Sequence, residues 1–83
     1  MRLKAVPWGM SLREVFARNL RRRRLEAGLS QEALAHEAGV DRTYISALER
    51  SVYSASIDMI ERLAQELGIE PHLLLDKSGR PKR

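Results

Sequence analysis

Apolar residues recur at helical spacing in several stretches of this chain, and short polar turns separate those stretches. The first stretch begins at Ser11, a capping residue with Glu14 three positions later, and it ends at Gly28. The pattern predicts a long first helix. Its apolar face consists of Leu12, Val15, Phe16, Leu20 and Ala27.

The stretch from residue 29 to residue 50 predicts two short helices joined by a tight turn. Ser30 and Asp41 are capping residues at the two helix starts, and each cap lies between apolar residues that can form a hydrophobic staple. Gly39 lies between the helices, where a left-handed residue would end the first one. The second helix, at about 42–50, leaves four polar side chains on the side away from the core: Arg42, Thr43, Ser46 and Arg50.

The remaining chain predicts two more helices. After a loop over residues 51–55, Ser56 caps a fourth helix, and Pro71 suits the first position of a short fifth one. The apolar face of the fourth helix consists of Ile57, Ile60, Leu63, Ala64 and Leu67. We therefore expect an all-α fold of five helices around one core.

The predicted helical domain covers residues 11–76, and both ends of the chain differ from it. Residues 1–10 show no periodicity and contain Pro7, so we predict an N-terminal arm there. Trp8 lies within the arm, and a tryptophan side chain usually packs against another part of the protein. Residues 77–83 lack large apolar side chains and form a predicted basic, flexible tail.

The charge of the chain is unevenly distributed. The formal net charge is +4, yet residues 11–76 contain nine Lys or Arg and eleven Asp or Glu, a net charge of −2. The positive balance therefore lies at the two ends. Within the first predicted helix, however, arginines gather in a pattern suited to phosphate neutralisation: Arg13, Arg18 and Arg21 to Arg24.

The residue types for most other chemistries are missing or scattered. The chain has no cysteine, hence no disulfide and no thiolate metal site. No apolar run is long enough for a membrane span or a secretory signal. His36 and His72 lie on different predicted helices, and solvated surface positions explain both. We expect a cytoplasmic protein that is not an enzyme and that uses no cofactor, metal or small-molecule ligand.

The segment LSQEALAHEAGV followed by DRTYISALER resembles the helix-turn-helix of lambda-repressor-like, Cro-type (XRE) DNA-binding domains. The phrases DRTYIS and ALER resemble, in particular, the controller proteins of restriction-modification systems within that family. The resemblance covers about residues 12–75. It implies a five-helix fold whose recognition helix, the second of the pair, enters the major groove of double-stranded DNA.

The resemblance also implies roles for the residues of the recognition helix. Arg42, Thr43 and Ala47 fall at base-facing positions, with Tyr44 and Ser46 at the groove walls. Arg42 can donate two hydrogen bonds to guanine, Thr43 can contact a thymine methyl group, and Ala47 offers apolar contact only. The alternative for Arg42 is a solvated first-turn residue. A cation at the positive end of a helix is disfavoured, which favours the functional interpretation.

Around the recognition helix, further contacts follow from the resemblance. Gln31 would contact a phosphate or a base, although a polar first-turn side chain without that role fits equally well. Arg50, Tyr53 and Ser54 lie near a loop that the family places against the DNA backbone, and Tyr53 is equally consistent with packing.

Two sets of residues carry structural expectations. Arg24 and Glu49 match family positions that form an ion pair, which would hold the angle of the recognition helix. Ile69, Leu73 and Leu75 are apolar residues near the C-terminus that could build a two-fold interface between two copies.

These expectations predict a sequence-specific transcriptional regulator that binds a pseudo-palindromic operator as a homodimer, because one recognition helix contacts few base pairs. The alternative is an antitoxin-like interaction protein that masks a partner protein through the arm or the tail. Salt separates the two, since DNA binding weakens steeply with added salt and apolar masking does not. An RNA-binding module is disfavoured because the aromatic stacking platform of such modules is missing.

Overall fold

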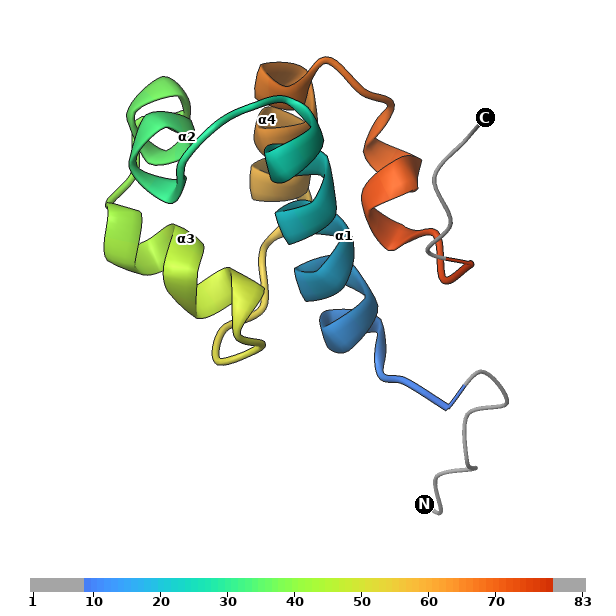
Figure 1. Cartoon of the computed structure of the whole chain (residues 1–83). Coiled ribbons are helices and arrows are strands. Elements are labelled where there is room, and N and C mark those ends of the chain that lie inside the picture. The colour runs from blue at the N-terminus through green and yellow to red at the C-terminus, as the bar shows by residue number, and fades with distance from the viewer. Residues whose placement is uncertain (1–8, 79–83) are drawn as a thin grey trace.

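Helices account for all the regular structure between residues 9 and 78, the part of the chain that the computed structural model describes (Figure 1). The α-helices are α1 (Leu12–Glu26), α2 (Gln31–Ala38), α3 (Arg42–Glu49) and α4 (Ile57–Leu67). The all-α class is therefore confirmed. The fifth predicted helix is instead a 3₁₀ helix, η1 (Pro71–Leu75). This 3₁₀ helix is only five residues long, and it ends before Asp76, where the backbone is extended.

Helix α1 lies between α3 and η1 (Figure 1). It contacts α3 on one side and η1 on the other, whereas α4 contacts both α2 and η1. The pair formed by α2 and α3 is thus supported by two helices from outside the pair.

Serine side chains cap three of the four α-helices as the sequence predicts. Ser11 accepts a hydrogen bond from the Glu14 amide at 3.1 Å, and the Glu14 carboxylate accepts one from the Ser11 amide at 2.9 Å, which completes the capping box. Ser30 and Ser56 each accept from the amide three residues later. Asp41 also occupies the cap position of α3, but its side chain forms no capping hydrogen bond, so that part of the prediction is wrong.

One left-handed residue lies within the helix-turn-helix and another directly follows it. Gly39, with φ at 73°, ends α2 and redirects the chain into α3, as predicted. Ser51, with φ at 62°, ends the turn after α3, and it is the one residue other than glycine with positive φ among residues 9–78. A side chain in this conformation is strained, whereas glycine adopts it freely.

The core draws apolar side chains from every helix, and its fully buried members include Leu20, Leu34, Ile45, Leu48, Leu63 and Leu74. Three predicted core residues lie outside it. Leu12 is 52% exposed, Ile57 is 84% exposed, and Ala27 is also exposed. All three lie at helix ends: Leu12 and Ile57 begin α1 and α4, and Ala27 follows the last residue of α1.

Side chains of α1 hold the C-terminal segment in place. Asn19 is fully buried, and its amide nitrogen donates to the carbonyl oxygens of Leu74 at 3.1 Å and Asp76 at 2.8 Å. The Arg18 guanidinium donates to the carbonyl oxygen of Lys77 at 3.1 Å. The start of the predicted tail is therefore fastened to α1. Residues 1–8, which include Trp8, and residues 79–83 lie outside the described part of the chain. These residues are most of the predicted arm and tail, the two segments that would mask a partner protein.

The strained turn at Ser51 gives a stability prediction. We expect Ser51→Gly to raise the free energy of unfolding by about 0.5–1 kcal/mol, because it removes the cost of a left-handed side chain. Urea denaturation followed by circular dichroism measures the change.

Gly39→Ala is the matched control, because it adds a side chain at a residue that is also in the left-handed region. The added methyl group would meet only the Arg62 guanidinium at 3.9 Å, an ordinary contact, so the backbone conformation sets the cost. We expect a loss of roughly 1–2 kcal/mol. A loss of stability in Ser51→Gly as well would show that the Ser51 side chain contributes more than its strain costs.

Candidate nucleic-acid interface

Helix α3 has one buried side and one polar, exposed side. Its apolar residues pack into the core, whereas Arg42, Thr43 and Arg50 are exposed and Ser46 is half-buried. Arg50 Nε donates to Ser46 Oγ at 3.3 Å, which joins these two side chains on the surface. The predicted polar side of the helix is therefore present, and it offers guanidinium and hydroxyl groups to the solvent.

The first turn of α3 differs electrostatically from that of the other α-helices. The described chain places an acidic residue in the first turn of α1, α2 and α4, and none in the first turn of α3. Arg42 occupies the first position instead, a cation at the positive end of the helix dipole, which costs about 0.3–1 kcal/mol. The Asp41 side chain also accepts no hydrogen bond from the first-turn amides. This end of the helix therefore suits an external anion.

Ala47 does not lie on the exposed side. It is only 5% exposed, and its backbone carbonyl accepts a hydrogen bond from the Val52 amide at 2.9 Å. A base could not reach its methyl group without displacing neighbouring residues. The burial of Ala47 corrects its assignment to a base-facing position.

A buried ion pair joins α1 to the end of α3. Arg24 Nε lies 2.6 Å from Glu49 Oε2, and a second guanidinium nitrogen donates to Glu49 Oε1 at 3.0 Å. The third nitrogen donates to the Leu29 carbonyl at 2.8 Å. The two side chains are only 8% and 3% exposed, so the pair is bidentate and nearly dehydrated. This geometry matches the ion pair that the family resemblance predicts.

Gln31 belongs to the same network. Its side-chain amide donates to Glu49 Oε1 at 3.0 Å, so α2 is tied to the end of α3. Glu49 therefore accepts hydrogen bonds from both α1 and α2. The sequence left two alternatives open for Gln31, an external contact or a polar first-turn residue without one, and neither included this internal hydrogen bond.

The pair also affects the titration of Arg24. The hydrogen bond from the guanidinium to Glu49 is the main reason why the pKa of Arg24 is raised, and burial acts in the opposite direction. A raised pKa in the folded state means that the stabilisation is present below the ordinary arginine pKa and disappears only as the pH rises beyond it. The contribution of Arg24 is therefore constant through the neutral range.

The loop after α3 brings a second tyrosine beside that helix. The rings of Tyr44 and Tyr53 are tilted against each other, with centroids 6.3 Å apart. Tyr44 is half-buried, and Tyr53 and Ser54 are exposed. The pairing means that Tyr53 both packs against α3 and keeps an exposed side, so the two interpretations of Tyr53 are compatible.

The arginines of α1 do not form one free basic surface. Arg24 is in the buried pair, and Arg18 donates to the C-terminal backbone. Arg22 and Arg23 lie 3.8 and 3.6 Å from the Glu26 carboxylate. Of the six predicted residues, Arg13 and Arg21 are exposed and take part in none of these contacts. The predicted basic surface is therefore smaller than the sequence suggested.

Metal-binding clusters and membrane-spanning helices are both missing from residues 9–78. No group of three or more His, Cys, Asp or Glu side chains is placed to hold a metal ion in this range. No helix in the same range is long and apolar enough to cross a membrane. His36 and His72 are both exposed, in agreement with surface positions.

Comparison with known proteins places this arrangement in a family. A family model described as helix-turn-helix matches residues 20–74, from the middle of α1 to η1. The chain belongs to this HTH_3 family. The family assignment agrees with the Cro-type (XRE) resemblance of the sequence.

Relatives of this HTH_3 protein are transcription regulators. It is 43% identical over 70 residues to a hypothetical transcription factor of Neisseria meningitidis, with 84% of this chain and 66% of that protein covered. It is 42% identical over 67 residues to control protein C.BamHI of Bacillus amyloliquefaciens, with 80% and 83% covered. The crystal structure of SinR, a master regulator for biofilm formation, in complex with DNA superimposes with a TM-score of 0.70 at 34% identity, covering 74% of this chain and 98% of that one.

The buried ion pair gives a second stability prediction. We expect Glu49→Ala to lower the free energy of unfolding by roughly 1–4 kcal/mol, because Arg24 is left in a nearly dehydrated position without its carboxylate. Thermal and urea denaturation at neutral pH measure the loss.

Glu26→Ala provides the control, since it also removes a glutamate that pairs with arginines of α1. The Glu26 side chain is 43% exposed and lies more than 3.5 Å from both arginines, so its loss should cost less than about 1 kcal/mol. Equal losses in the two variants would contradict the special role of the buried pair.

Proposed function

We propose that this protein is a sequence-specific, DNA-binding transcription regulator that inserts α3 into the major groove. The observation that carries the proposal is the combination of an exposed polar side of α3 with a buried network that fixes the angle of that helix. Base edges are distinguished over distances of a few ångströms, so a reading helix must be held in one orientation. Arg24, Glu49 and Gln31 supply that constraint from two neighbouring helices.

Arg42 and Thr43 are the proposed base-reading residues. Both are exposed in the first turn of α3, and the guanidinium of Arg42 can donate two parallel hydrogen bonds to guanine O6 and N7. Thr43 can contact a thymine methyl group or donate through its hydroxyl. Tyr44 and Ser46, both half-buried, lie at the sides of the helix and suit the groove walls. Ala47 is not part of this proposed set.

Phosphate contacts would come from the groups around the helix. The first-turn amides of α3, which make no hydrogen bond to the Asp41 side chain, are donors for a phosphate. Arg50, Tyr53 and Ser54 are exposed at the other end of α3 and in the loop that follows. Gln31 uses one amide N–H for Glu49, and its second N–H is a further donor. Gln31 can therefore join the structural network to a phosphate at the same time.

A homodimer on a pseudo-palindromic operator completes the proposal. Helix α3 has eight residues and one exposed side, so a single copy can contact only a few base pairs. Two copies related by a two-fold axis double the readout and fix the spacing of the half-sites. SinR, the relative whose structure was solved with DNA, supports the DNA-binding part of the proposal.

The oligomeric state can be measured without DNA. At micromolar concentration we expect a dimer in sedimentation velocity, because the monomer exposes large apolar side chains that association would cover. A single species of 9.5 kDa well above that concentration would contradict the two-fold operator.

Base reading by Arg42 gives a specificity prediction. We expect Arg42→Ala to weaken binding to the cognate site by about 1–3 kcal/mol per half-site, while binding to scrambled DNA stays largely unchanged. The asymmetry arises because a base contact is lost and the phosphate contacts of other residues remain. Titration against cognate and scrambled duplexes at two salt concentrations measures both affinities.

Arg50→Ala is the comparison variant, since Arg50 is an exposed arginine at the other end of α3. As a phosphate-binding residue it should weaken both duplexes alike and reduce the salt slope by about one. If Arg42→Ala behaves in this way instead, Arg42 is a phosphate contact, and base reading moves to Thr43 or Tyr44.

A further inference from the structure

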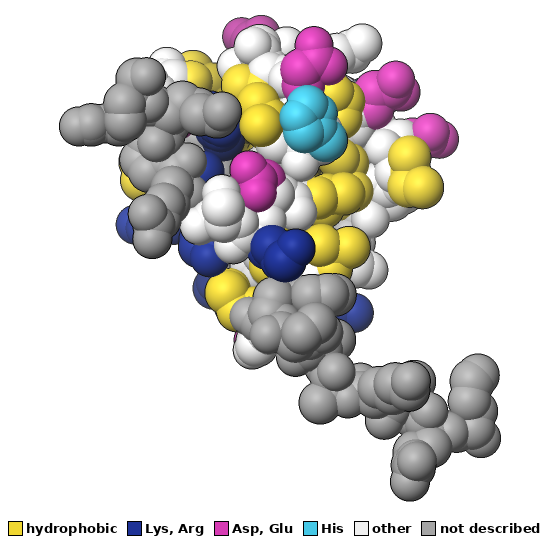
Figure 2. All heavy atoms as spheres, turned by 90° about the vertical axis from the view of Figure 1, so that its right-hand side faces the viewer, with side chains coloured by type: hydrophobic (Ala, Val, Ile, Leu, Met, Phe, Trp, Pro, Cys, Tyr) yellow, Lys and Arg dark blue, Asp and Glu magenta, His cyan; other side chains and the backbone are white. Residues whose placement is uncertain are grey.

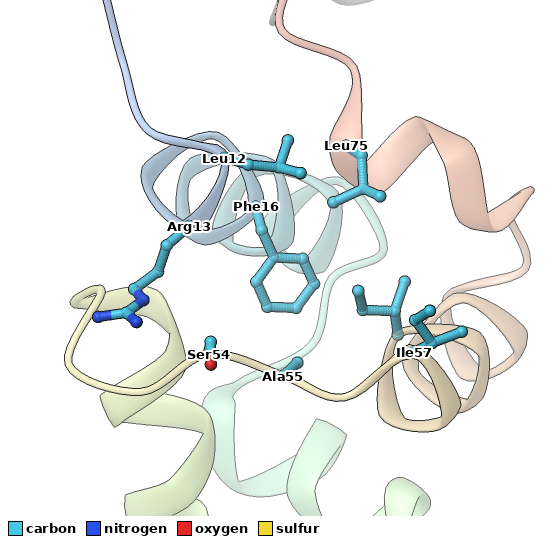
Figure 3. A pocket seen from close by; sticks show the side chains of 8 residues that line it. Leu12, Arg13, Phe16, Ser54, Ala55, Ile57 and Leu75 are labelled. Carbon is cyan, nitrogen blue, oxygen red and sulfur yellow. The ribbon is translucent and has the colours of Figure 1, made fainter. Parts of the chain in front are cut away.

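One exposed arginine at the start of α1 lies beside the loop that follows α3. Arg13 and Ser54 both line a groove of about 440 Å³ between the start of α1 and that loop (Figure 3). In this view the Arg13 side chain extends from α1 toward the loop, away from Phe16. The fold therefore places a guanidinium group beside Ser54, a residue of the proposed phosphate-contacting loop.

The position of Arg13 along α1 explains why its side chain is on this side of the helix. The span from residue 13 to residue 24 is about three helical turns at 3.6 residues per turn, so Arg13 and Arg24 lie on the same side of α1. Arg24 is buried there against Glu49 of α3, whereas Arg13 is exposed. The side of α1 that faces α3 thus has a structural arginine near its end and an exposed arginine at its start.

Arg13 makes no hydrogen bond or ion pair with another side chain or backbone group in residues 9–78. The carboxylate of the adjacent Glu14 accepts a hydrogen bond from the Ser11 amide at 2.9 Å, so it belongs to the helix cap. Arg13 also lies in the first turn of α1, where the positive end of the helix dipole disfavours a cation. Arg42 has the same unfavourable position in α3. Such a cation is suited to an anion from outside the chain.

The distribution of charge on the molecule favours a polyanion at this end. Figure 2 shows most of the acidic side chains of that face in its upper part, and Lys and Arg side chains in its left and lower parts. The start of α1 lies in the lower part of Figure 1, and the two views differ by a rotation about the vertical axis. DNA that approaches the start of α1 therefore meets little repulsion from carboxylates on this face.

We propose that Arg13 binds a DNA phosphate and extends the proposed interface from the helix-turn-helix onto α1. The phosphate is next to those that Tyr53 and Ser54 contact, because the guanidinium lies beside the same loop. An arginine offers several N–H donors in one plane, which suits two oxygens of a single phosphate. The inference rests on the proposed DNA-binding function and adds a contact from outside the pair of helices that reads the groove.

The structure distinguishes Arg13 from the other arginines of α1, to which the sequence gave one common role. Arg18 and Arg24 donate hydrogen bonds to backbone carbonyls of the same chain. Arg21 is exposed, but the eight positions between residues 13 and 21 are about two helical turns, and Arg21 does not line the groove. Arg21 is therefore a matched control: an exposed cation of the same helix that is not beside the loop.

Arg13→Gln tests the phosphate contact, because it removes the charge and keeps a side chain of similar length. We expect affinity for a site selected from random DNA and affinity for its scrambled version to fall by the same factor, about three- to tenfold per half-site at 0.1 M salt. The slope of log affinity against log salt should decrease by about one for each bound copy. Fluorescence anisotropy titrations at several salt concentrations measure both quantities.

The stability of the fold should not follow the loss of DNA affinity. Arg13→Gln removes a cation from the positive end of α1, so we expect its Tm to equal or slightly exceed that of the wild type. Weaker DNA binding in this variant would then not arise from unfolding. Arg13→Lys keeps the charge and should retain the wild-type salt slope, with a smaller loss of affinity because lysine lacks the planar arrangement of donors.

Arg21→Gln makes the same change of charge on the same helix and should bind both duplexes as the wild type does. Phosphate ethylation interference then locates the contact. We expect one phosphate in each half-site at which ethylation weakens the wild type and Arg21→Gln but has no further effect on Arg13→Gln.

Three outcomes would overturn the inference: wild-type affinity and salt slope in Arg13→Gln, an equal loss in Arg21→Gln, or a loss in Arg13→Gln on the selected site alone. The second would indicate a general effect of net charge, and the third a base contact. Failure of the proposed function is distinguishable, because it is measured on the wild type. A wild type that binds selected and scrambled duplexes equally well would contradict sequence-specific regulation, whereas the difference between Arg13→Gln and Arg21→Gln would still decide the phosphate contact. A wild type that binds no DNA would overturn both.

Discussion

The buried contact between Arg24 and Glu49 is the constraint on which the geometry of the proposed interface depends. Glu49 lies at the last position of α3, and it receives hydrogen bonds from Arg24 of α1 and Gln31 of α2. A dehydrated ion pair adds little net stability compared with apolar packing, yet it is costly to break or to misalign. Its main effect is therefore on orientation. The helix that presents Arg42 and Thr43 cannot rotate without separating these groups.

The two ends of α3 serve different purposes. Its C-terminal end is fixed internally through Glu49, whereas its N-terminal end begins with an arginine and has no acid in the first turn. The polar first turn costs some helix stability, and the proposed contact with DNA explains why that cost is tolerated. Helix α4 supports the helix-turn-helix from outside. Arg62 donates to the Ala38 carbonyl at the end of α2, and Ile57 and Ile60 line an apolar groove beside η1.

Local patterns predicted the helices well, because serine caps, Gly39 and helical spacing act over a few residues. The ion pair was predicted through family resemblance, since no local pattern connects residues 25 positions apart. Three features were not predicted. Gln31 turned out to be bound to Glu49, Asn19 fastens the C-terminal segment, and Ile57 is exposed. Each depends on which neighbouring segment lies beside the residue, and spacing along one helix does not contain that information.

The central claim is that Arg42, held by this network, reads a guanine in the major groove. Methylation interference on a site selected from random DNA tests it directly, because a methyl group at guanine N7 blocks that acceptor in the major groove. The account predicts one guanine in each half-site whose methylation prevents binding of the wild type and has no further effect on Arg42→Ala. Interference at the same guanines in both proteins, or at none, would contradict it.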